Sequence, residues 1–188
     1  FQNIKKPFFY EKKINIKKIE KKIKFRISKN QNFIEYSEEA FRYLKDISQK
    51  IKVNKGGLLL IDYGYTDQKM KNTLQGVLNH KFANILEHIF NVDITHNINF
   101  NLYKNFIKKI AGLDNILTTQ KYFLNNMGIM ERAEIVSKNQ NFLKKADIYY
   151  RIKRLIDEKQ MGELFKVMLI KDQKNKFNLG FNSWLLLS

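Results

Sequence analysis

The chain has 188 residues, 44% of them hydrophobic, and it contains no cysteine. This size and composition allow one buried core and exclude a disordered tail, a disulfide framework and a thiolate metal site. Lysine carries most of the net charge of +17, so nucleic-acid binding is one interpretation and solvated lysine faces are the other.

Neither a targeting signal nor a membrane anchor is predicted from these residues. No apolar run approaches the roughly 20 residues of a membrane span, and the first residues lack the apolar region and cleavage site of a signal peptide. Three scattered histidines do not predict a metal site. We therefore expect a cytoplasmic protein. Because the chain begins with Phe1 rather than Met, we also expect it to be a piece of something longer.

The first region, 1–36, is predicted to contain a β-hairpin. Ile14–Ile16 and Ile23–Ile27 alternate apolar and polar residues, as half-buried strands do. A charged connection separates the two runs.

The second region, 37–65, is predicted to be a helix followed by a strand. Ser37 and the two glutamates after it are typical of a helix start. Apolar residues then recur at helical spacing, at Ala40, Phe41, Leu44, Ile47 and Ile51. The run Leu58–Ile61 follows two glycines and predicts a strand buried on both faces. A helix followed by a buried strand is half of an α/β repeat.

The third region, 66–112, begins with a stretch of weak periodicity, Thr66–Phe100. This stretch is too long for a simple connector and is a candidate functional insertion. A helix marked by Leu102, Phe106 and Ile110 is predicted to follow it, and Gly112 ends that helix.

The last region, 113–188, is predicted to contain strands at Asn115–Thr119 and Leu164–Ile170, with helices between them and a tail from Gly180 to Ser188. One helix is expected over Asn139–Asp157. Its predicted buried side consists of Phe142, Ala146, Tyr149 and Ile156.

Several separated motifs stand out along the chain: GGLLLIDYGY (56–65), NTLQG (72–76), HKF (80–82), DIT (93–95), TQ (119–120), FL (123–124), GI (128–129), ERAE (131–134) and MGELFKV (161–167). In order and spacing these motifs resemble the MidA family. MidA proteins are S-adenosylmethionine-dependent methyltransferases, and their mitochondrial members assist respiratory complex I assembly by dimethylating an arginine of a partner subunit. The resemblance covers most of the chain from Ser37 to Phe181.

The resemblance implies an α/β fold, namely the C-terminal portion of a class I, Rossmann-like, seven-stranded methyltransferase sheet with an added β-hairpin and helical insertion. The strands at 58, 115 and 164 would be the fifth, sixth and seventh, with the seventh running antiparallel between the other two. The Gly-rich cofactor loop of the family has no counterpart here. We therefore expect no S-adenosylmethionine binding by this chain alone.

The implied absence of a fourth strand has a structural consequence. It would leave the edge of Leu58–Ile61 open, and one face of Leu58, Leu60, Val167 and Leu169 exposed.

The resemblance also suggests site residues. Asp62 and Tyr63 end the fifth strand, where open α/β sheets bind their ligands. Asp62 is a candidate for steering a cationic guanidinium or for holding the substrate nitrogen for in-line attack on the cofactor's methyl group. Alternatively, Asp62 caps the next turn and Tyr63 packs. His80, Asp93 and Thr95 lie in the insertion that the family folds over its active site, although His80 is equally well explained as a structural imidazole.

The insertion departs from the family pattern in two motifs. HKFANIL (80–86) lacks the acid and proline of His-x-Phe/Tyr-x-Asp-Pro-Leu, and THNINF (95–100) has asparagines in place of the His and Asp of Thr-Ala-His-Val-Asp-Phe. Because asparagine does not titrate, these positions have lost any acid-base role.

Three functions remain open. The leading one is the C-terminal part of a MidA-type protein arginine methyltransferase, inactive alone. The second is a non-catalytic interaction module that pairs with a separately encoded N-terminal half. A basic RNA-binding domain is a distant third.

Overall fold

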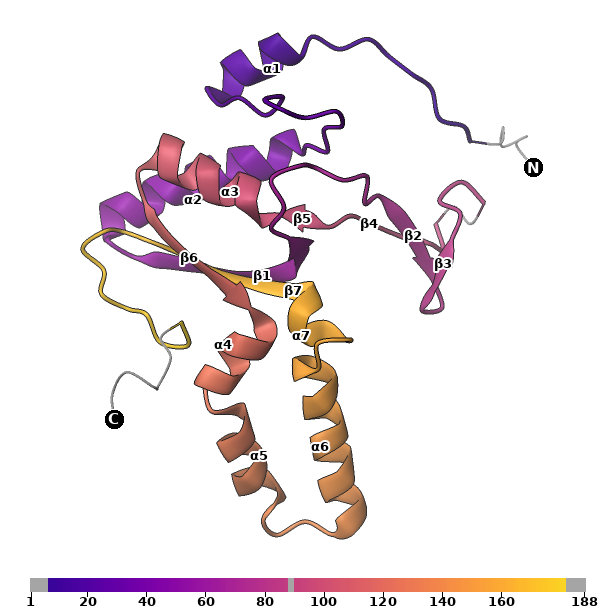
Figure 1. Ribbon diagram of the computed structural model, residues 1–188, viewed down its shortest axis with the longest axis vertical. Helices are drawn as coiled ribbons and strands as arrows, with labels where there is room; N and C mark the ends of the chain where they lie inside the picture. Colours follow the sequence, from indigo (N-terminus) through magenta and orange to yellow (C-terminus); the bar gives the residue numbers. More distant parts are fainter. Residues whose placement is uncertain (1–6, 88–89, 182–188) are drawn as a thin grey trace. The chain divides into compact units, whose positions relative to one another are not determined.

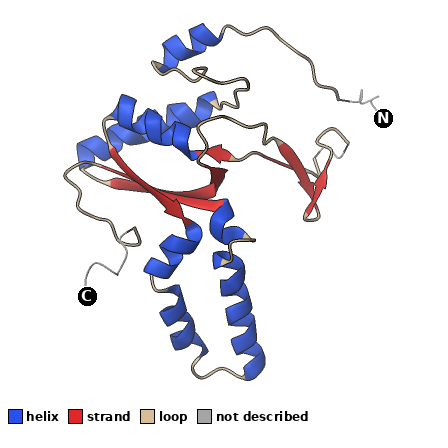
Figure 2. Ribbon diagram, viewed as in Figure 1, coloured by secondary structure: helices blue, strands red, loops and turns tan. Residues whose placement is uncertain are grey.

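The computed structural model describes residues 7–87 and 90–181 (Figures 1 and 2). The chain divides into two compact units. One comprises Phe1–Ser37 and Asp67–Asn97, and the other Glu38–Thr66 and Ile98–Ser188. The start of the predicted hairpin region, 1–6, and most of the predicted tail, 182–188, lie outside the described residues.

The second unit is built on a four-stranded sheet of order β5-β1-β7-β6. Its strands are β1 (Gly57–Tyr65), β5 (Ile98–Asn99), β6 (Asp114–Thr119) and β7 (Phe165–Lys171). Strand β7 runs antiparallel to both β1 and β6, with Leu58 opposite Ile170 and Ile116 opposite Leu169. The sequence prediction of an antiparallel seventh strand between the fifth and sixth is confirmed.

On one side, β1 pairs with β7 from Gly57 to Tyr63. On the other side, β5 runs parallel to β1 and pairs with Gly64 and Tyr65 alone. No other strand among the described residues lies on this side of β1. The edge from Gly57 to Tyr63 is therefore open.

The prediction that this strand is buried on both faces is wrong. Leu59 and Ile61 are 44% and 45% exposed, and they share one face of the sheet because side chains alternate along a strand. The expectation that Val167 and Leu169 would be exposed is also wrong, since both are buried. The exposed apolar surface of this face belongs to β1 itself.

Helix α2 (Glu38–Asn54) forms as predicted. Glu38 and Glu39 lie in its first turn, where carboxylates interact favourably with the helix dipole. Phe41, Leu44 and Ile51 form the buried stripe. The helix ends where Lys55 adopts a left-handed conformation (φ 53°).

Helix α3 (Phe100–Phe106) continues into a π-helical turn, η1 (Ile107–Ala111), and Gly112 ends it in a left-handed conformation (φ 61°). Phe106 packs edge-on against Phe41 of α2, with ring centroids 4.7 Å apart. Figure 1 shows α2 and α3 together on one side of the sheet. This aromatic contact joins the helical layer above the strands.

A helical arm, residues 120–164, connects β6 to β7. It consists of α4 (Gln120–Asn126), α5 (Ile129–Ser137), α6 (Phe142–Ile156) and the short α7 (Met161–Leu164). In Figure 1 the arm extends away from the sheet and returns to it.

The predicted buried side of α6 is wrong for three of its four residues, and only Ile156 is half-buried as expected. Phe142 and Tyr149 are exposed, as is Ala146. The half-buried residues of the helix are Ile148, Ile152, Leu155 and Ile156.

The first unit contains a helix where the sequence predicts a hairpin. Helix α1 spans Ile16–Ile23, and the Asn15 side chain caps it by accepting a hydrogen bond from the Lys18 backbone N–H (3.1 Å). Ile16, Ile19 and Ile23 are half-buried, and their spacing of three and four residues is helical. In so short a segment, the pattern of apolar residues does not distinguish the two-residue period of a strand from the roughly 3.6-residue period of a helix.

The insertion contributes a three-stranded antiparallel sheet of order β3-β2-β4. Its strands are β2 (Gln75–Leu78), β3 (Lys81–Ala83) and β4 (Asp93–Thr95). The regular secondary structure in the described part of this stretch, which was expected to be a helical insertion, is therefore β-structure. The segment before α2 is tied to it by hydrogen bonds from Met70 N–H to Gln31 Oε1 (2.7 Å) and from Thr73 N–H to Glu35 Oε1 (3.2 Å).

Candidate functional site

The candidate site lies at one edge of the four-stranded sheet. Because β1 and β6 are both antiparallel to β7, they run parallel to each other and their carboxyl ends lie at the same edge. We call this the carboxyl edge; it comprises Asp62–Tyr65, Thr119 and Phe165. Open α/β sheets bind ligands at this kind of edge.

Asp62 is half-buried near the end of β1. Its Oδ1 accepts a hydrogen bond from the Tyr63 backbone N–H (2.8 Å). Lys166 lies directly opposite on β7, but its ammonium group donates to the Glu163 carbonyl. The carboxylate therefore has local backbone support, which agrees with a capping role.

Tyr103 of α3 is an ionisable neighbour of Asp62 that the sequence analysis missed. Its side chain is buried, and burial together with the negative charge of Asp62 raises its pKa to about 12. The phenol therefore stays protonated at neutral pH. Phe100, Tyr103, Phe106 and Ile107 are all buried, and their helical spacing could have identified this stripe in the sequence.

Tyr63 points to the opposite face of β1 from Asp62, because consecutive side chains alternate. Its ring packs edge-on against Phe165, with centroids 5.6 Å apart and planes at 79°. This contact supports the packing interpretation of Tyr63.

The other predicted site residues belong to the first unit. His80 is exposed and lies in the tight turn between β2 and β3, where both Asn79 and His80 have positive φ. Asp93 is exposed opposite Val77. Thr95 is opposite Gln75, whose Nε2 donates to the threonine hydroxyl (3.2 Å). His80 and Thr95 therefore lie at opposite ends of β2.

The asparagines that depart from the family pattern act in local turns. Asn84 Oδ1 accepts from the Leu86 N–H (3.0 Å), and Asn99 Oδ1 caps α3 by accepting from the Leu102 N–H (3.0 Å). The Asn97 N–H donates to the Thr73 hydroxyl (2.9 Å). Asn84 and Asn99 thus keep the acceptor function of a carboxylate without its charge.

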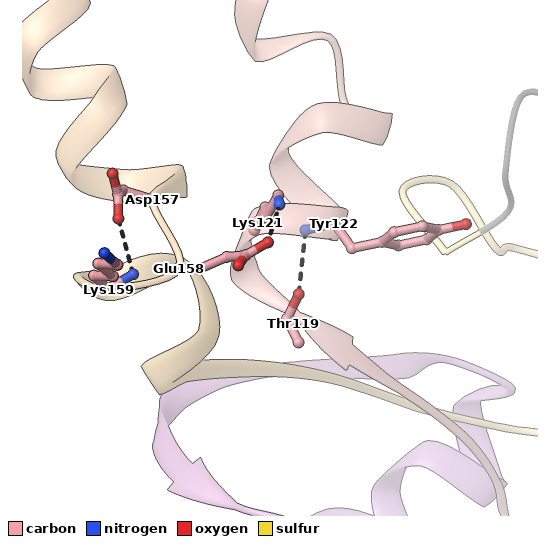
Figure 3. A network of polar contacts seen from close by, with 6 residues as sticks. All are labelled: Thr119, Lys121, Tyr122, Asp157, Glu158 and Lys159. Carbon is pink, nitrogen blue, oxygen red and sulfur yellow. Dashed lines mark hydrogen bonds and ion pairs between the residues drawn. The ribbon is translucent and has the colours of Figure 1, made fainter.

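The arm is anchored at the carboxyl edge by a network of polar contacts (Figure 3). The Thr119 hydroxyl accepts from the Tyr122 N–H (3.3 Å) at the start of α4. Lys121 forms an ion pair with Glu158 (2.6 Å), which lies between α6 and α7. In addition, Gln120 Nε2 donates to the Leu155 carbonyl (2.9 Å). These contacts join both ends of the arm next to the sheet.

The glycines provide a test of whether the chain could hold a nucleoside cofactor. A glycine loop binds such a ligand by leaving space beside its backbone. A Cβ on Gly64 would lie 2.2 Å from the Ile98 carbonyl, on Gly76 2.6 Å from the Ala83 carbonyl, and on Gly162 2.3 Å from the Ile156 carbonyl. These glycines serve the chain's own packing, while Gly112, Gly128 and Gly180 adopt left-handed conformations.

Gly56 and Gly57 lie at the amino end of β1, away from the carboxyl edge. The residues present therefore do not fit S-adenosylmethionine. Among the described residues there is also no group of three His, Cys, Asp or Glu side chains that could hold a metal ion. None of the helices in residues 7–87 and 90–181 could cross a membrane.

The chain is similar to known methyltransferases in sequence. It is 27% identical over 141 residues to "Protein arginine methyltransferase NDUFAF7, mitochondrial" of Danio rerio, covering 73% of this chain and 32% of that protein. The protein of the same name from Homo sapiens is 28% identical over 137 residues, covering 72% of this chain and 30% of the relative. The chain thus spans about a third of the length of the curated relatives it matches.

Two solved structures share the fold. Both are of Burkholderia thailandensis proteins and are 24% identical to this chain. One has a TM-score of 0.60 and covers 79% of this chain and 41% of its own. The other, bound to S-adenosyl-homocysteine, has a TM-score of 0.56 and covers 78% and 38%. These matches support the Rossmann-like methyltransferase fold.

A protein-family model matches residues 5–119, more than half of the chain. The family is described as "Putative S-adenosyl-L-methionine-dependent methyltransferase". Together with the similarity to NDUFAF7 proteins, this match confirms the resemblance drawn from the motifs: the chain belongs to the MidA family of S-adenosyl-L-methionine-dependent methyltransferases.

Proposed function

We propose that this chain forms the substrate-side part of a protein arginine methyltransferase and is inactive alone, and that a segment outside these 188 residues supplies the cofactor-binding strands. The open edge of β1 carries this proposal. It runs from Gly57 to Tyr63 and contains Asp62. A strand added there in parallel with β1 would run in the same direction as β5, which pairs with β1 at Gly64 and Tyr65.

Asp62 is the proposed contact for the substrate. A carboxylate can accept two parallel hydrogen bonds from the planar, permanently charged guanidinium of arginine. Because Tyr103 stays protonated at neutral pH, the carboxylate has no second negative charge beside it from this phenol. The names of the similar proteins support arginine as the target, and a respiratory complex I subunit is the partner proposed from the family resemblance.

The glycine packing supports inactivity of the chain alone. The close approaches at Gly64, Gly76 and Gly162 are all to the chain's own backbone. A second candidate function, a non-catalytic module that pairs with an N-terminal half, is favoured by Asn84 and Asn99, which retain turn and cap contacts without a titratable group. The cytoplasmic location stays a prediction.

Complementation distinguishes these functions. The chain is coexpressed with the part of the human relative that precedes the matched region, and the purified pair is tested for methylation of an arginine-containing protein extract with radiolabelled S-adenosylmethionine. The proposal expects a stable pair that methylates arginine, while each half is inactive. A stable pair that binds the cofactor without activity would favour the non-catalytic module, and failure to pair would contradict both.

A further inference from the structure

Helix α6 has a second apolar stripe, which faces away from its neighbours in the arm. Its half-buried residues, from Ile148 to Ile156, lie on the side of the helix that contacts α4, α5 and α7. On the other side, Leu143 and Tyr150 are 76% and 70% exposed, and Ala146 between them is also exposed. We call Leu143, Ala146 and Tyr150 the outer stripe. Phe142, 81% exposed, adjoins it.

The spacing of the outer stripe is that of a helix–helix contact. The three residues stand at positions i, i+3 and i+7, which is the a-d-a spacing of a heptad. A helix of a partner that lies along α6 could therefore pack its own apolar residues against all three.

The charge of α6 indicates the kind of partner. The helix contains five cations and one anion, a net charge of +4. Its single carboxylate, on Asp147, is paired with Arg151 (2.9 Å). Lys153 and Arg154 are exposed and continue the outer stripe toward the base of the arm. A partner that binds this surface therefore needs an apolar stripe with carboxylates at the end that lies next to Lys153 and Arg154.

We propose that the outer stripe of α6 is a docking surface for an acidic amphipathic helix of another protein. The partner's apolar side chains lie against Leu143, Ala146 and Tyr150, and its carboxylates pair with Lys153 and Arg154. A second copy of this chain fits less well, because two α6 helices packed together would each carry a net charge of +4. The only carboxylate of each helix, on Asp147, is already paired with Arg151. A lipid surface also fits less well, because the polar loop 138–141 forms the end of the arm.

The helical arm connects the outer stripe to the carboxyl edge of the sheet. Its two ends are joined at the carboxyl edge by Gln120, Lys121 and Glu158, and Asp62 lies at that same edge. That the docked protein is also the one presented to Asp62 rests on the proposed function. The binding itself does not depend on it.

The test uses the full 188-residue chain and a synthetic amphipathic peptide of about 21 residues, three heptads with leucine at a and d and glutamate at e and g. Binding is measured by fluorescence anisotropy. The double variant Leu143→Ser/Tyr150→Ser and the double variant Lys153→Glu/Arg154→Glu should each weaken binding about tenfold or more, a loss easily resolved from the dissociation constants.

Matched controls on α2 separate docking from general attraction to a basic protein. Val53→Ser removes another exposed apolar side chain, and Lys45→Glu/Lys50→Glu makes the same change in charge. Both controls should change binding less than about twofold. Equal losses in arm and control variants would overturn the proposal.

Two further measurements address the other occupants. If the arm variants lose binding to phosphatidylglycerol vesicles but not to the peptide, the surface binds lipid and the proposal is wrong. If sedimentation shows a dimer that Leu143→Ser/Tyr150→Ser dissociates, the occupant is a second copy and the proposal is again wrong. Peptide binding that depends on the arm, without either result, supports it. Because none of these readouts requires methyl transfer, they are independent of the proposed function.

Discussion

Asp62 is the residue on which the proposed activity depends most. In an active pair with a cofactor-binding half, Asp62→Asn should lower the turnover number at least tenfold, a loss of about 1.4 kcal/mol of transition-state stabilisation, because the amide cannot neutralise a guanidinium. The thermal midpoint should change little, since the amide oxygen can still accept from the Tyr63 N–H.

The matched control is Asp114→Asn, which removes an exposed carboxylate at the amino end of β6. It should leave the turnover number unchanged. Equal activity of the Asp62→Asn variant and the parent chain would assign Asp62 to the local capping role alone.

Tyr103 should make the stability of the chain fall at high pH. Its pKa is about 12 in the folded protein against 10.0 for the unperturbed side chain. The unfolded chain therefore loses this proton first, so the stabilisation is fully present below pH 10 and is lost between pH 10 and 12. Relative to Tyr103→Phe, the free energy of unfolding of the parent should fall by on the order of 2–3 kcal/mol over that window.

Urea unfolding of the parent chain and of Tyr103→Phe at pH values of about 9, 10, 11 and 12 measures this difference in the free energy of unfolding. A parallel fall in the two chains would mean that Tyr103 ionises as freely in the folded state as in the unfolded one. Ultraviolet titration of the phenols in Asp62→Asn should then show whether the carboxylate contributes to the raised pKa.

At the scale of single residues, sequence reasoning succeeded where position along a strand decides the environment. Asp62 could be placed at the carboxyl edge of the sheet because the apolar run Leu58–Ile61 ends directly before it. Tyr103 could not be singled out, because the sequence of α3 contains two overlapping helical stripes, one with Leu102 and one with Tyr103. The local roles of Asn84 and Asn99 depend on backbone conformation, which the sequence alone does not give.

Among the elements, β1 is the one whose surface should limit solubility. An apolar strand with an open edge is a template for pairing with other chains, and the run Leu58–Ile61 lacks the charges, proline or bulge that protect natural edges. We expect the isolated chain to self-associate at low micromolar concentration. Leu59→Lys should reduce this association, because Leu59 is 44% exposed on this strand.

The control for the added charge is Val53→Lys, which changes an exposed residue of α2. Sedimentation velocity should show less association for Leu59→Lys and no change for Val53→Lys. A monomeric parent chain with slow amide exchange along Leu58–Ile61 would contradict the open edge.

Elements with strong end signals were predictable, and elements defined only by a short apolar pattern were not. Helix α2 has acids at its start and glycines after its end, so its span followed from the sequence. The region of α1 has isoleucines at both odd and even spacings, which fits a strand or a helix. In α6 two apolar stripes are present, and the sequence does not specify which one packs against the arm.

For the whole molecule, the expected behaviour toward the cofactor is simple. Isothermal titration of S-adenosylmethionine into the isolated 188-residue chain should show no measurable binding. The space beside Gly64, Gly76 and Gly162 is filled by the chain's own backbone, so these glycines leave no room for a nucleoside. A dissociation constant in the micromolar range, about −8 kcal/mol, would contradict the proposed division of the site. Titration of the complemented pair is the positive control.

The order of the strands was predictable at this scale because several motifs matched one family. The division into two units was not. It depends on pairings such as Gln31 with Met70 and Glu35 with Thr73, which join residues far apart in the chain through one or two hydrogen bonds. No periodicity marks such contacts in advance.

The central pairing of the sheet has a consequence for synthesis of the chain. Leu58 of β1 pairs with Ile170 of β7, so about 110 residues must be translated after β1 before its partner exists. At roughly 5–20 residues per second, the nascent chain carries an unpaired apolar strand for roughly 5–20 seconds. During that time β1 is available to chaperones and to neighbouring nascent chains, and slower translation of the intervening 100 residues or so would lengthen this exposure without changing the folded protein.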